Sequence, residues 1–197
     1  MIRKTKASYA ASKLSSQPDA GRPDGGGLRW GALVALLAAM AIPVTAEASQ
    51  FGVRVGASMG NGVSYNSQEV YWRTGLPWGV GQPQSWHVRS ALELNAGRLA
   101  TSDDSLTTAG AGLHLRLQNP EVPVAVSGGI GPTYLSESQL ADRDFGGHWQ
   151  FTSHIGAFAS LGPGIGVGYR IQHTSNGGLY SDNDGYTVQA VELRLSF

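Results

Sequence analysis

The sequence predicts an all-β protein: an eight-stranded antiparallel transmembrane β-barrel of the outer-membrane type that follows a cleaved signal peptide. Beyond the N-terminal region, apolar and polar residues alternate with period two, and clusters of Gly, Asn, Asp, Pro and Ser interrupt the alternation. The C-terminal run AVELRLSF alternates most clearly, with Glu192 and Arg194 on its polar face. No run of about 18 apolar residues follows the N-terminal region, which argues against transmembrane helices.

Residues 1–48 are predicted to be the signal peptide, and residues 49–197 the barrel domain. Basic residues from Arg3 to Arg29 precede the apolar segment GALVALLAAMAI, which has the length of a signal-peptide core. Ala46-Glu-Ala48 fits a small-residue cleavage site and predicts a mature chain that begins at Ser49. Two alternatives remain open, namely cleavage after Val44-Thr-Ala46 and an uncleaved membrane anchor.

The composition excludes several classes of protein. The chain has no cysteine, so a disulfide framework and Cys-ligated zinc are excluded. Its formal net charge is zero and it has no basic block, so no nucleic-acid partner is expected. Four histidines lack ligand-like spacing with each other, and we expect polar lumen residues rather than metal ligands: His87, His114, His148 and His154.

Eight segments are predicted as strands, and many reach the length of about 9–11 residues that a tilted strand needs to cross a bilayer. An even number of antiparallel strands can close and so leave no open edge. The predicted segments are 50–58, 68–76, 85–98, 106–117, 122–135, 148–160, 164–174 and 186–197.

The apolar face of these strands is predicted to contact lipid and the polar face to line the lumen. The alternative is a soluble sandwich or a lipocalin-like barrel, with the apolar face turned inward. Ionisable residues recur on the polar face of several strands, which favours the membrane barrel. Aromatic residues near strand ends, as in membrane girdles, favour it too: Tyr71, Trp72, Trp78, Trp86 and Trp149.

Both termini are then expected at the periplasmic end, with short turns there and longer loops outside. Tight periplasmic turns are predicted near Asn119-Pro120 and near 162–164. The segments 59–67, 99–105, 136–147 and 175–185 are predicted to be external.

A His and a Ser near the end of the seventh predicted strand share one face. His173 and Ser175 have the parity of Ile171 and the other apolar residues of this strand, so both are expected on the outer surface at the external end. A neutral His can take the proton of a Ser hydroxyl and make it a nucleophile, and the adjacent Asn176 can serve an oxyanion. The alternative is a pair of rim residues that hydrogen-bond to lipid headgroups.

The motif His173-Thr-Ser175-Asn176, followed by a short loop that ends in Asn183-Asp-Gly185, resembles the signature of the lipid A 3-O-deacylase (PagL) family. The terminal aromatic residue resembles the C-terminal signal of outer-membrane barrels, and residues 149–156 resemble the family's sixth strand. The resemblance implies a carboxylic ester hydrolase of the bacterial cell outer membrane that removes the acyl chain ester-linked at position 3 of lipid A, the lipid part of lipopolysaccharide. It implies Ser175 as nucleophile, His173 as general base and Asn176 as the oxyanion residue. No cofactor or metal is expected, because a His–Ser mechanism requires none, and calcium at a site at the level of the lipid is left open as the alternative.

The chain departs from the family pattern at two positions. Thr187 stands where the family has the Glu that orients the His, and Ser153 stands where it tends to have an acidic residue. Glu192 has lumen parity, whereas Asp182 and Asp184 lie in the adjacent loop and are candidates to approach from above.

Two hypotheses follow from these departures, and a third class is disfavoured. The first is a lipid A deacylase in which the third catalytic residue, the one that orients the His, is non-standard or missing. The second is a catalytically impaired barrel with a structural or interaction role. A pore or an adhesin is disfavoured, because Arg170, Arg194 and Glu192 are expected to plug the lumen and the external loops are short. We expect a monomer or a homodimer.

Overall fold

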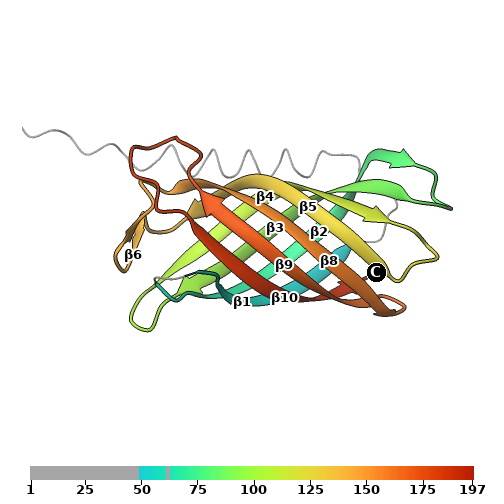
Figure 1. Ribbon diagram of the computed structural model, residues 1–197, viewed down its shortest axis with the longest axis horizontal. Coiled ribbons are helices and arrows are strands. Elements are labelled where there is room, and N and C mark those ends of the chain that lie inside the picture. Colours follow the sequence, from blue (N-terminus) through green and yellow to red (C-terminus); the bar gives the residue numbers. More distant parts are fainter. Residues whose placement is uncertain (1–48, 61–62) are drawn as a thin grey trace, which may run out of the picture. The chain divides into compact units, whose positions relative to one another are not determined.

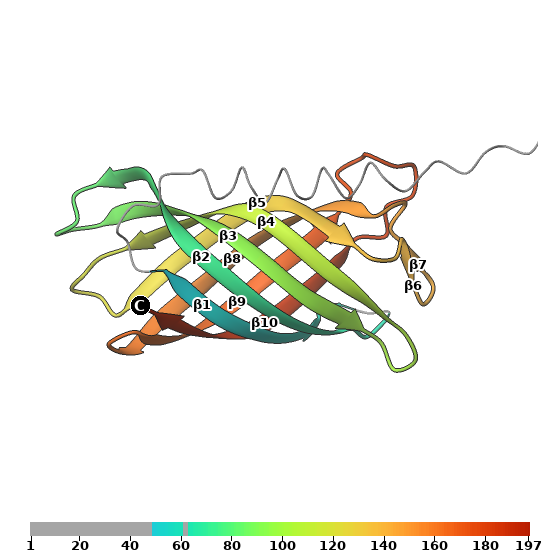
Figure 2. The same ribbon diagram turned by 180° about the vertical axis from the view of Figure 1, so that it is seen from behind.

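The computed structural model describes residues 49–60 and 63–197, and within them eight long antiparallel strands close into a barrel (Figures 1 and 2). The predicted fold class is therefore confirmed. The barrel strands are β1 (Gln50–Ser58), β2 (Asn66–Gly81), β3 (His87–Ala100), β4 (Ser105–Gln118), β5 (Val124–Leu135), β8 (Trp149–Gly162), β9 (Ile165–Ser175) and β10 (Tyr186–Ser196). The predicted signal peptide lies outside the described residues and stays a prediction.

Neighbours in the sequence pair in space, and β10 pairs with β1 to close the barrel. The C-terminus lies at the end that carries the β2–β3, β4–β5 and β8–β9 turns (Figure 1). The last of these turns is short, since β8 ends at Gly162 and β9 begins at Ile165, as predicted. Among the described residues, no helix is long and apolar enough to cross a membrane.

The connections differ from the prediction in two places. The segment expected as a longer external loop at 99–105 is a tight turn, because Thr101 and Asp104 bond to each other through backbone and hydroxyl. The segment predicted as an external loop at 136–147 contains a small hairpin that was not predicted, formed by β6 (Gln139–Leu140) and β7 (Arg143–Asp144). Short polar side chains that bond to nearby backbone make such turns compact.

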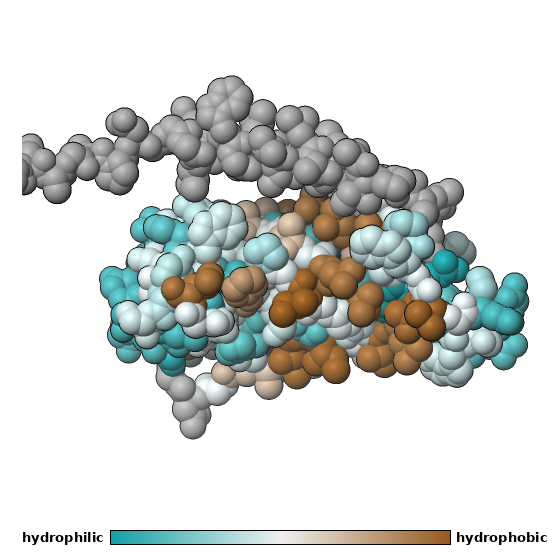
Figure 3. Space-filling view, turned by 90° about the horizontal axis from the view of Figure 1, so that it is seen from above, coloured by the Kyte–Doolittle hydropathy of each residue, from teal (hydrophilic) through white to brown (hydrophobic). Residues whose placement is uncertain are grey.

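The outer surface of the barrel is apolar in the middle and polar toward both ends (Figure 3). On β10, Val191, Leu193 and Leu195 are exposed, whereas Glu192 and Arg194 are buried in the lumen. The predicted face assignment of this strand is confirmed. Exposed apolar residues on every barrel strand are what a lipid-facing surface requires.

An ion-pair network fills the middle of the lumen. The Arg54 guanidinium contacts the carboxylates of Glu93 at 2.8 Å, Glu192 at 2.9 Å and Glu69 at 3.3 Å. The Arg170 guanidinium contacts Glu93 at 3.0 Å. Charged groups taken out of water need such partners, so the network packs the middle of the lumen. Arg170 and Glu192 take part in it as predicted, whereas Arg194 does not and lies over the Phe158 ring instead.

Replacing Glu93 with Gln is expected to lower the free energy of unfolding by about 3–5 kcal/mol, because three buried arginines would lose their shared carboxylate. Thermal unfolding followed by heat-modifiable gel mobility would measure it. Glu69→Gln is the matched control, since Glu69 accepts only longer bonds, from Arg54 at 3.3 Å and from Gln172 at 3.4 Å. Equal losses in the two variants would contradict a network centred on Glu93.

The lumen is apolar instead at the end of the barrel away from the C-terminus (Figure 1), which is the end predicted to be external. A buried cluster lies beneath the external loops and is formed by Tyr65, Leu99, Leu106, Leu135, Leu140, Phe145, Tyr186 and Val188. The alternation of the strands predicts polar lumen positions and gave no indication of this cluster. The cluster anchors a loop that flanks the His-x-Ser motif, because Phe145 belongs both to this loop and to the cluster.

Candidate active site

His173 projects from β9 onto the outer surface of the barrel. It is exposed, whereas its neighbours Gln172 and Thr174 are buried in the lumen. The structure therefore confirms the parity argument for this side chain. In the strand register, His173 lies opposite Thr187 on β10 and opposite Ser153 on β8, so these three residues form one row across the outer face.

Thr187 holds the imidazole of His173. The distance from His173 Nδ1 to Thr187 Oγ1 is 3.0 Å. When Nδ1 carries the proton, it donates to the threonine hydroxyl, and Nε2 is then the basic nitrogen. This is the tautomer that a general base needs, because the nitrogen that accepts the proton must be free of hydrogen.

Ser175 is the last residue of β9 and lies on the same face, half-buried. Ser175 and His173 both lie next to Gly185. A Cβ added at Gly185 would lie 3.0 Å from Ser175 Cβ and 3.2 Å from His173 Cε1, so both side chains border the same small space. No hydrogen bond joins His173 to Ser175 in the part of the chain that the structure describes. Catalytic hydrogen bonds are often absent or long before a substrate is bound.

Asn176 points inward and organises the loop that follows Ser175. Its side chain is fully buried, and its Nδ2 donates to the carbonyls of Phe145 and Asp182. Its Oδ1 accepts from Gly178 N at 2.8 Å, and its own backbone N–H donates to Asn183 Oδ1 at 3.0 Å. The side-chain amide is thus committed to the loop and is not presented to the surface on which Ser175 lies.

The model of the family described as lipid A 3-O-deacylase (PagL) matches residues 59–196. The chain belongs to the PagL family. This match includes the whole of β2 to β10 and every residue of the row around His173.

Individual relatives agree with the PagL assignment. The lipid A deacylase PagL of Pseudomonas aeruginosa is 28% identical over 156 residues, which cover 72% of this chain and 82% of that protein. The lipid A deacylase PagL of Bordetella bronchiseptica is 36% identical over 72 residues, which cover 36% of this chain but only 40% of that protein.

The fold agrees as well. The crystal structure of the outer-membrane enzyme PagL superimposes with a TM-score of 0.66 at 19% identity, over 75% of this chain and 99% of that one. Like its relatives, this PagL-family chain is an outer-membrane β-barrel protein. The predicted localisation is therefore confirmed.

The carboxylates near the site are engaged elsewhere. Asp184 Oδ2 accepts from the backbone N–H of Asp144 at 3.1 Å, and Asp182 Oδ2 accepts from Ser181 Oγ at 3.0 Å. Glu192 lies in the lumen, as its parity predicts, and binds Arg54. Among the described residues, no carboxylate is hydrogen-bonded to His173, and the hydroxyl of Thr187 is the group at its Nδ1.

The acidic loop next to the site is ordered by its own hydrogen bonds. Asp144 Oδ2 accepts from the Gln139 amide at 2.8 Å and Oδ1 accepts from Gly146 N at 2.8 Å, and these bonds lower the pKa of the Asp144 carboxyl. Since Asp184 in turn binds Asp144, the β6–β7 hairpin and the loop after Ser175 are joined. Asp184, one of the two loop carboxylates that the sequence offered as substitutes for the missing Glu, therefore has a structural role.

The prediction of polar lumen residues is confirmed for His114 and His154, which lie in the lumen, and is wrong for His148. His114 on β4 and His154 on β8 stack, with 3.2 Å between Nδ1 and Nε2, although they are far apart in sequence. His148 lies at the strand end, where it bonds to the Leu135 carbonyl and stacks on the outward-facing Tyr134. No group of three or more His, Asp and Glu able to hold a metal is found in the described residues.

Replacing Asn176 with Ala is expected to loosen the loop after Ser175 and cost about 1–3 kcal/mol locally, because buried carbonyls lose their donors. Hydrogen exchange of residues 177–185 would report it as faster exchange, while the barrel strands stay protected. Asn66→Ala, at an exposed strand end, is the control and should leave this loop unchanged. Unaltered exchange in Asn176→Ala would show that the loop does not depend on this side chain.

Proposed function

We propose that this protein is a lipid A deacylase that hydrolyses the 3-O-linked acyl ester at the outer leaflet, using Ser175 and His173. The observation that carries the proposal is the row on the outer surface, in which Thr187 Oγ1 lies 3.0 Å from His173 Nδ1 and Ser175 follows on the same face of β9. A His and a Ser on a lipid-facing surface are costly unless they act on something there. The relatives' name and the site's position indicate the same substrate, a lipid of the outer leaflet.

The reaction would run in two steps. Ser175 Oγ gives its proton to His173 Nε2 and attacks the ester carbonyl, and the sugar oxygen leaves with the proton returned by His173. Water then attacks the acyl-serine, again giving its proton to His173, and the fatty acid is released as Ser175 recovers its hydroxyl. No cofactor or metal enters this scheme.

The oxyanion would be bound by the loop that Asn176 orders, rather than by the Asn176 side chain itself. Asn183 is the best candidate donor, because Asn176 N–H holds its Oδ1 and thereby turns its NH₂ group away from that contact. Asn183 is exposed and lies two residues before Gly185, which borders Ser175. One such donor is worth about 10²–10³ in kcat.

Thr187 would act as a positioning residue. A hydroxyl fixes the tautomer and the ring orientation of His173, but it supplies no negative charge to stabilise the imidazolium that forms. We therefore expect activity below that of a carboxylate-assisted site. Purified, refolded protein incubated with lipid A in detergent micelles should release only the fatty acid from position 3, whereas no release from folded protein would support the structural role instead.

A second polar pair on the same outer face would contact the substrate. The Tyr169 hydroxyl donates to Gln189 Oε1 at 2.7 Å, and both residues are exposed where neighbouring side chains are apolar. Gln189 lies two residues beyond Thr187 on the same face of β10, toward the membrane interior. Its NH₂ group is then placed to bind amide or hydroxyl groups of the acyl chains of lipid A.

Gln189→Leu is expected to raise KM by about three- to tenfold with little change in kcat, since one hydrogen bond to the bound substrate is lost far from the reacting ester. The assay is lipid A deacylation at varied substrate concentration. Gln68→Leu, an exposed glutamine on β2, is the matched control and should leave KM unchanged. An unchanged KM in Gln189→Leu would exclude this residue from substrate binding.

A further inference from the structure

Three aromatic rings gather on the outer surface at the external end of the barrel, where β5 ends and β8 begins. Tyr134 lies directly opposite Trp149 in the strand register, and their ring centres are 5.4 Å apart with the planes inclined by 69°. The ring of His148 stacks on Tyr134 at 5.5 Å, with an inclination of only 19°. Trp149 and His148 are exposed, whereas Tyr134 is half-buried. Tyr134 therefore holds two exposed rings in a fixed arrangement, and we call these three residues the aromatic patch.

His148 adds a directed hydrogen-bond acceptor to the aromatic patch. Its Nδ1 lies 2.9 Å from the Leu135 carbonyl oxygen, which can only accept, so Nδ1 is the nitrogen that carries the proton. In the neutral ring Nε2 then has no hydrogen and can accept from a hydroxyl or amide group. The backbone N–H of Leu135 donates to the His148 carbonyl at 2.8 Å, which ties the same two residues a second time. A membrane girdle accounts for Tyr134 and Trp149, but not for a histidine held in this way.

The aromatic patch lies next to Ser175, on the side away from the membrane interior. Phe151 lies opposite Ser175 in the register of β8 and β9, and Trp149 precedes Phe151 by two residues on the same face. The rise of a strand separates the Cα atoms of Phe151 and Trp149 by about 7 Å, which is close to the length of one substituted sugar ring. Phe151 is exposed and borders the loop after Ser175, since a Cβ added at Gly177 would lie 3.1 Å from its Cδ2. A continuous apolar strip therefore leads from Ser175 to Trp149.

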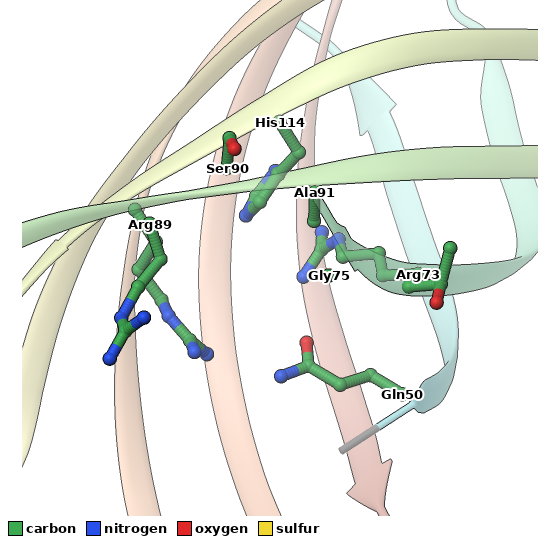
Figure 4. A pocket seen from close by; sticks show the side chains of 9 residues that line it. Gln50, Arg73, Gly75, Arg89, Ser90, Ala91 and His114 are labelled. Carbon is green, nitrogen blue, oxygen red and sulfur yellow. The ribbon is translucent and has the colours of Figure 1, made fainter. Parts of the chain in front are cut away.

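The interior of the barrel leaves little room for a headgroup near Ser175. The buried apolar cluster fills the external end, and the cavity beside Tyr186 has a volume of only about 20 Å³. A larger cavity of about 160 Å³ lies at the end that carries the C-terminus, where Gln50, Arg73 and His114 reach into it from different strands (Figure 4). A group bound beside Ser175 therefore lies on the outer surface, where the aromatic patch is.

We propose that the aromatic patch binds the sugar ring that carries the ester attacked by Ser175, and so selects acylated sugars over other acyl esters of the membrane. A sugar ring has apolar C–H groups on its faces and hydroxyl or amide groups around its edge. The exposed indole of Trp149 matches the first, and Nε2 of His148 accepts from the second. Because Tyr134 holds both rings beforehand, little conformational entropy is lost when the sugar binds. The identity of this sugar rests on the proposed function, whereas the binding surface itself does not.

Binding is tested without hydrolysis in the Ser175→Ala protein, refolded in zwitterionic detergent micelles. An alkyl N-acetylglucosaminide is titrated, and nuclear magnetic resonance follows the indole N–H signal of Trp149, identified as the signal that Trp149→Leu lacks. The glycoside should shift this signal saturably, whereas an alcohol with the same alkyl chain and no sugar should not. His148→Ala should weaken the binding about three- to tenfold, because one hydrogen bond to the sugar is lost. No saturable shift, or an equal shift with the alcohol, would overturn the proposal.

Enzyme kinetics provide the second readout, which a merely structural aromatic residue would not alter. Trp149→Leu should raise KM about three- to tenfold for lipid A in micelles with little change in kcat, since the lost contact is away from the reacting ester. The same variant should hydrolyse the methyl ester of the released fatty acid like the parent, because this ester has no sugar.

Trp86→Leu is the matched control for Trp149→Leu. The two indoles are 52% and 46% exposed, but Trp86 lies at the opposite end of the barrel, so its variant should behave like the parent with both esters. An unchanged KM for lipid A in Trp149→Leu would overturn the proposal. A saturable shift with the glycoside but no hydrolysis of lipid A would support this site and contradict only the hydrolytic function.

Discussion

Ser175→Ala is expected to reduce lipid A deacylation by about four orders of magnitude or more, because the nucleophile and its acyl intermediate are lost together. The change removes one hydroxyl from a half-buried position at the end of β9, so the barrel should fold and melt as the parent does. Initial rates with lipid A in micelles, measured as released fatty acid, would give the ratio.

Ser153→Ala is the matched control for this prediction. Ser153 is also a serine on the outer face, and it lies opposite His173 in the register of β8 and β9. Its loss should change the rate by less than about tenfold, since it neither attacks nor carries a proton in the proposed reaction. Similar rates for Ser175→Ala and the parent would show that hydrolysis, if present, uses another group.

Thr187→Glu is expected to raise kcat/KM by about two to four orders of magnitude. A carboxylate in the place of the Thr187 hydroxyl, which is 3.0 Å from His173 Nδ1, would stabilise the imidazolium as well as orient the ring. Loss of the acid in such triads costs about 10⁴ in kcat, and a half-buried, engineered carboxylate is expected to recover part of it. The measurement is the same rate assay with the refolded variant.

Thr187→Gln tests whether the gain expected for Thr187→Glu comes from the negative charge of the side chain or from its shape. It has nearly the size of Glu and can hydrogen-bond to His173, but it carries no charge, so it should give no gain over the parent. If Glu and Gln give equal rates, charge at this position has no influence on the reaction. If the parent is inactive and only the Glu variant hydrolyses lipid A, the protein is the catalytically impaired barrel that the sequence left as its second hypothesis.

The row around His173 could be predicted from the sequence because antiparallel strands joined by tight turns have little freedom of register. The turn at 162–164 fixes Ser153 opposite His173, and β10 then places Thr187 on the other side. Parity assigned His173 to the outer face, and the strand pairing places Ser153 and Thr187 beside it. The same logic separated Glu192 from the site, and the structure confirms its place in the lumen.

Contacts that cross loops could not be predicted in this way. Asn176 follows Ser175 in sequence, which suggested a role in the oxyanion site, but its partners Phe145 and Asp182 lie in loops whose paths no periodicity describes. His114 and His154 lie on β4 and β8, and β5 lies between these strands. Their rings meet because Gly129 on β5 has no side chain at this point. A Cβ there would approach the His154 ring, so the glycine allows the contact.

The most direct test of the account is the mass of lipid A isolated from bacteria that express the full chain, after heat-modifiable mobility shows that the barrel is folded in the outer membrane. The account predicts that lipid A loses the mass of one acyl chain, that the lost chain is the ester-linked chain at position 3, and that cells expressing Ser175→Ala keep it. Unchanged lipid A in cells with a folded parent barrel would contradict the assignment of this surface as a deacylase site.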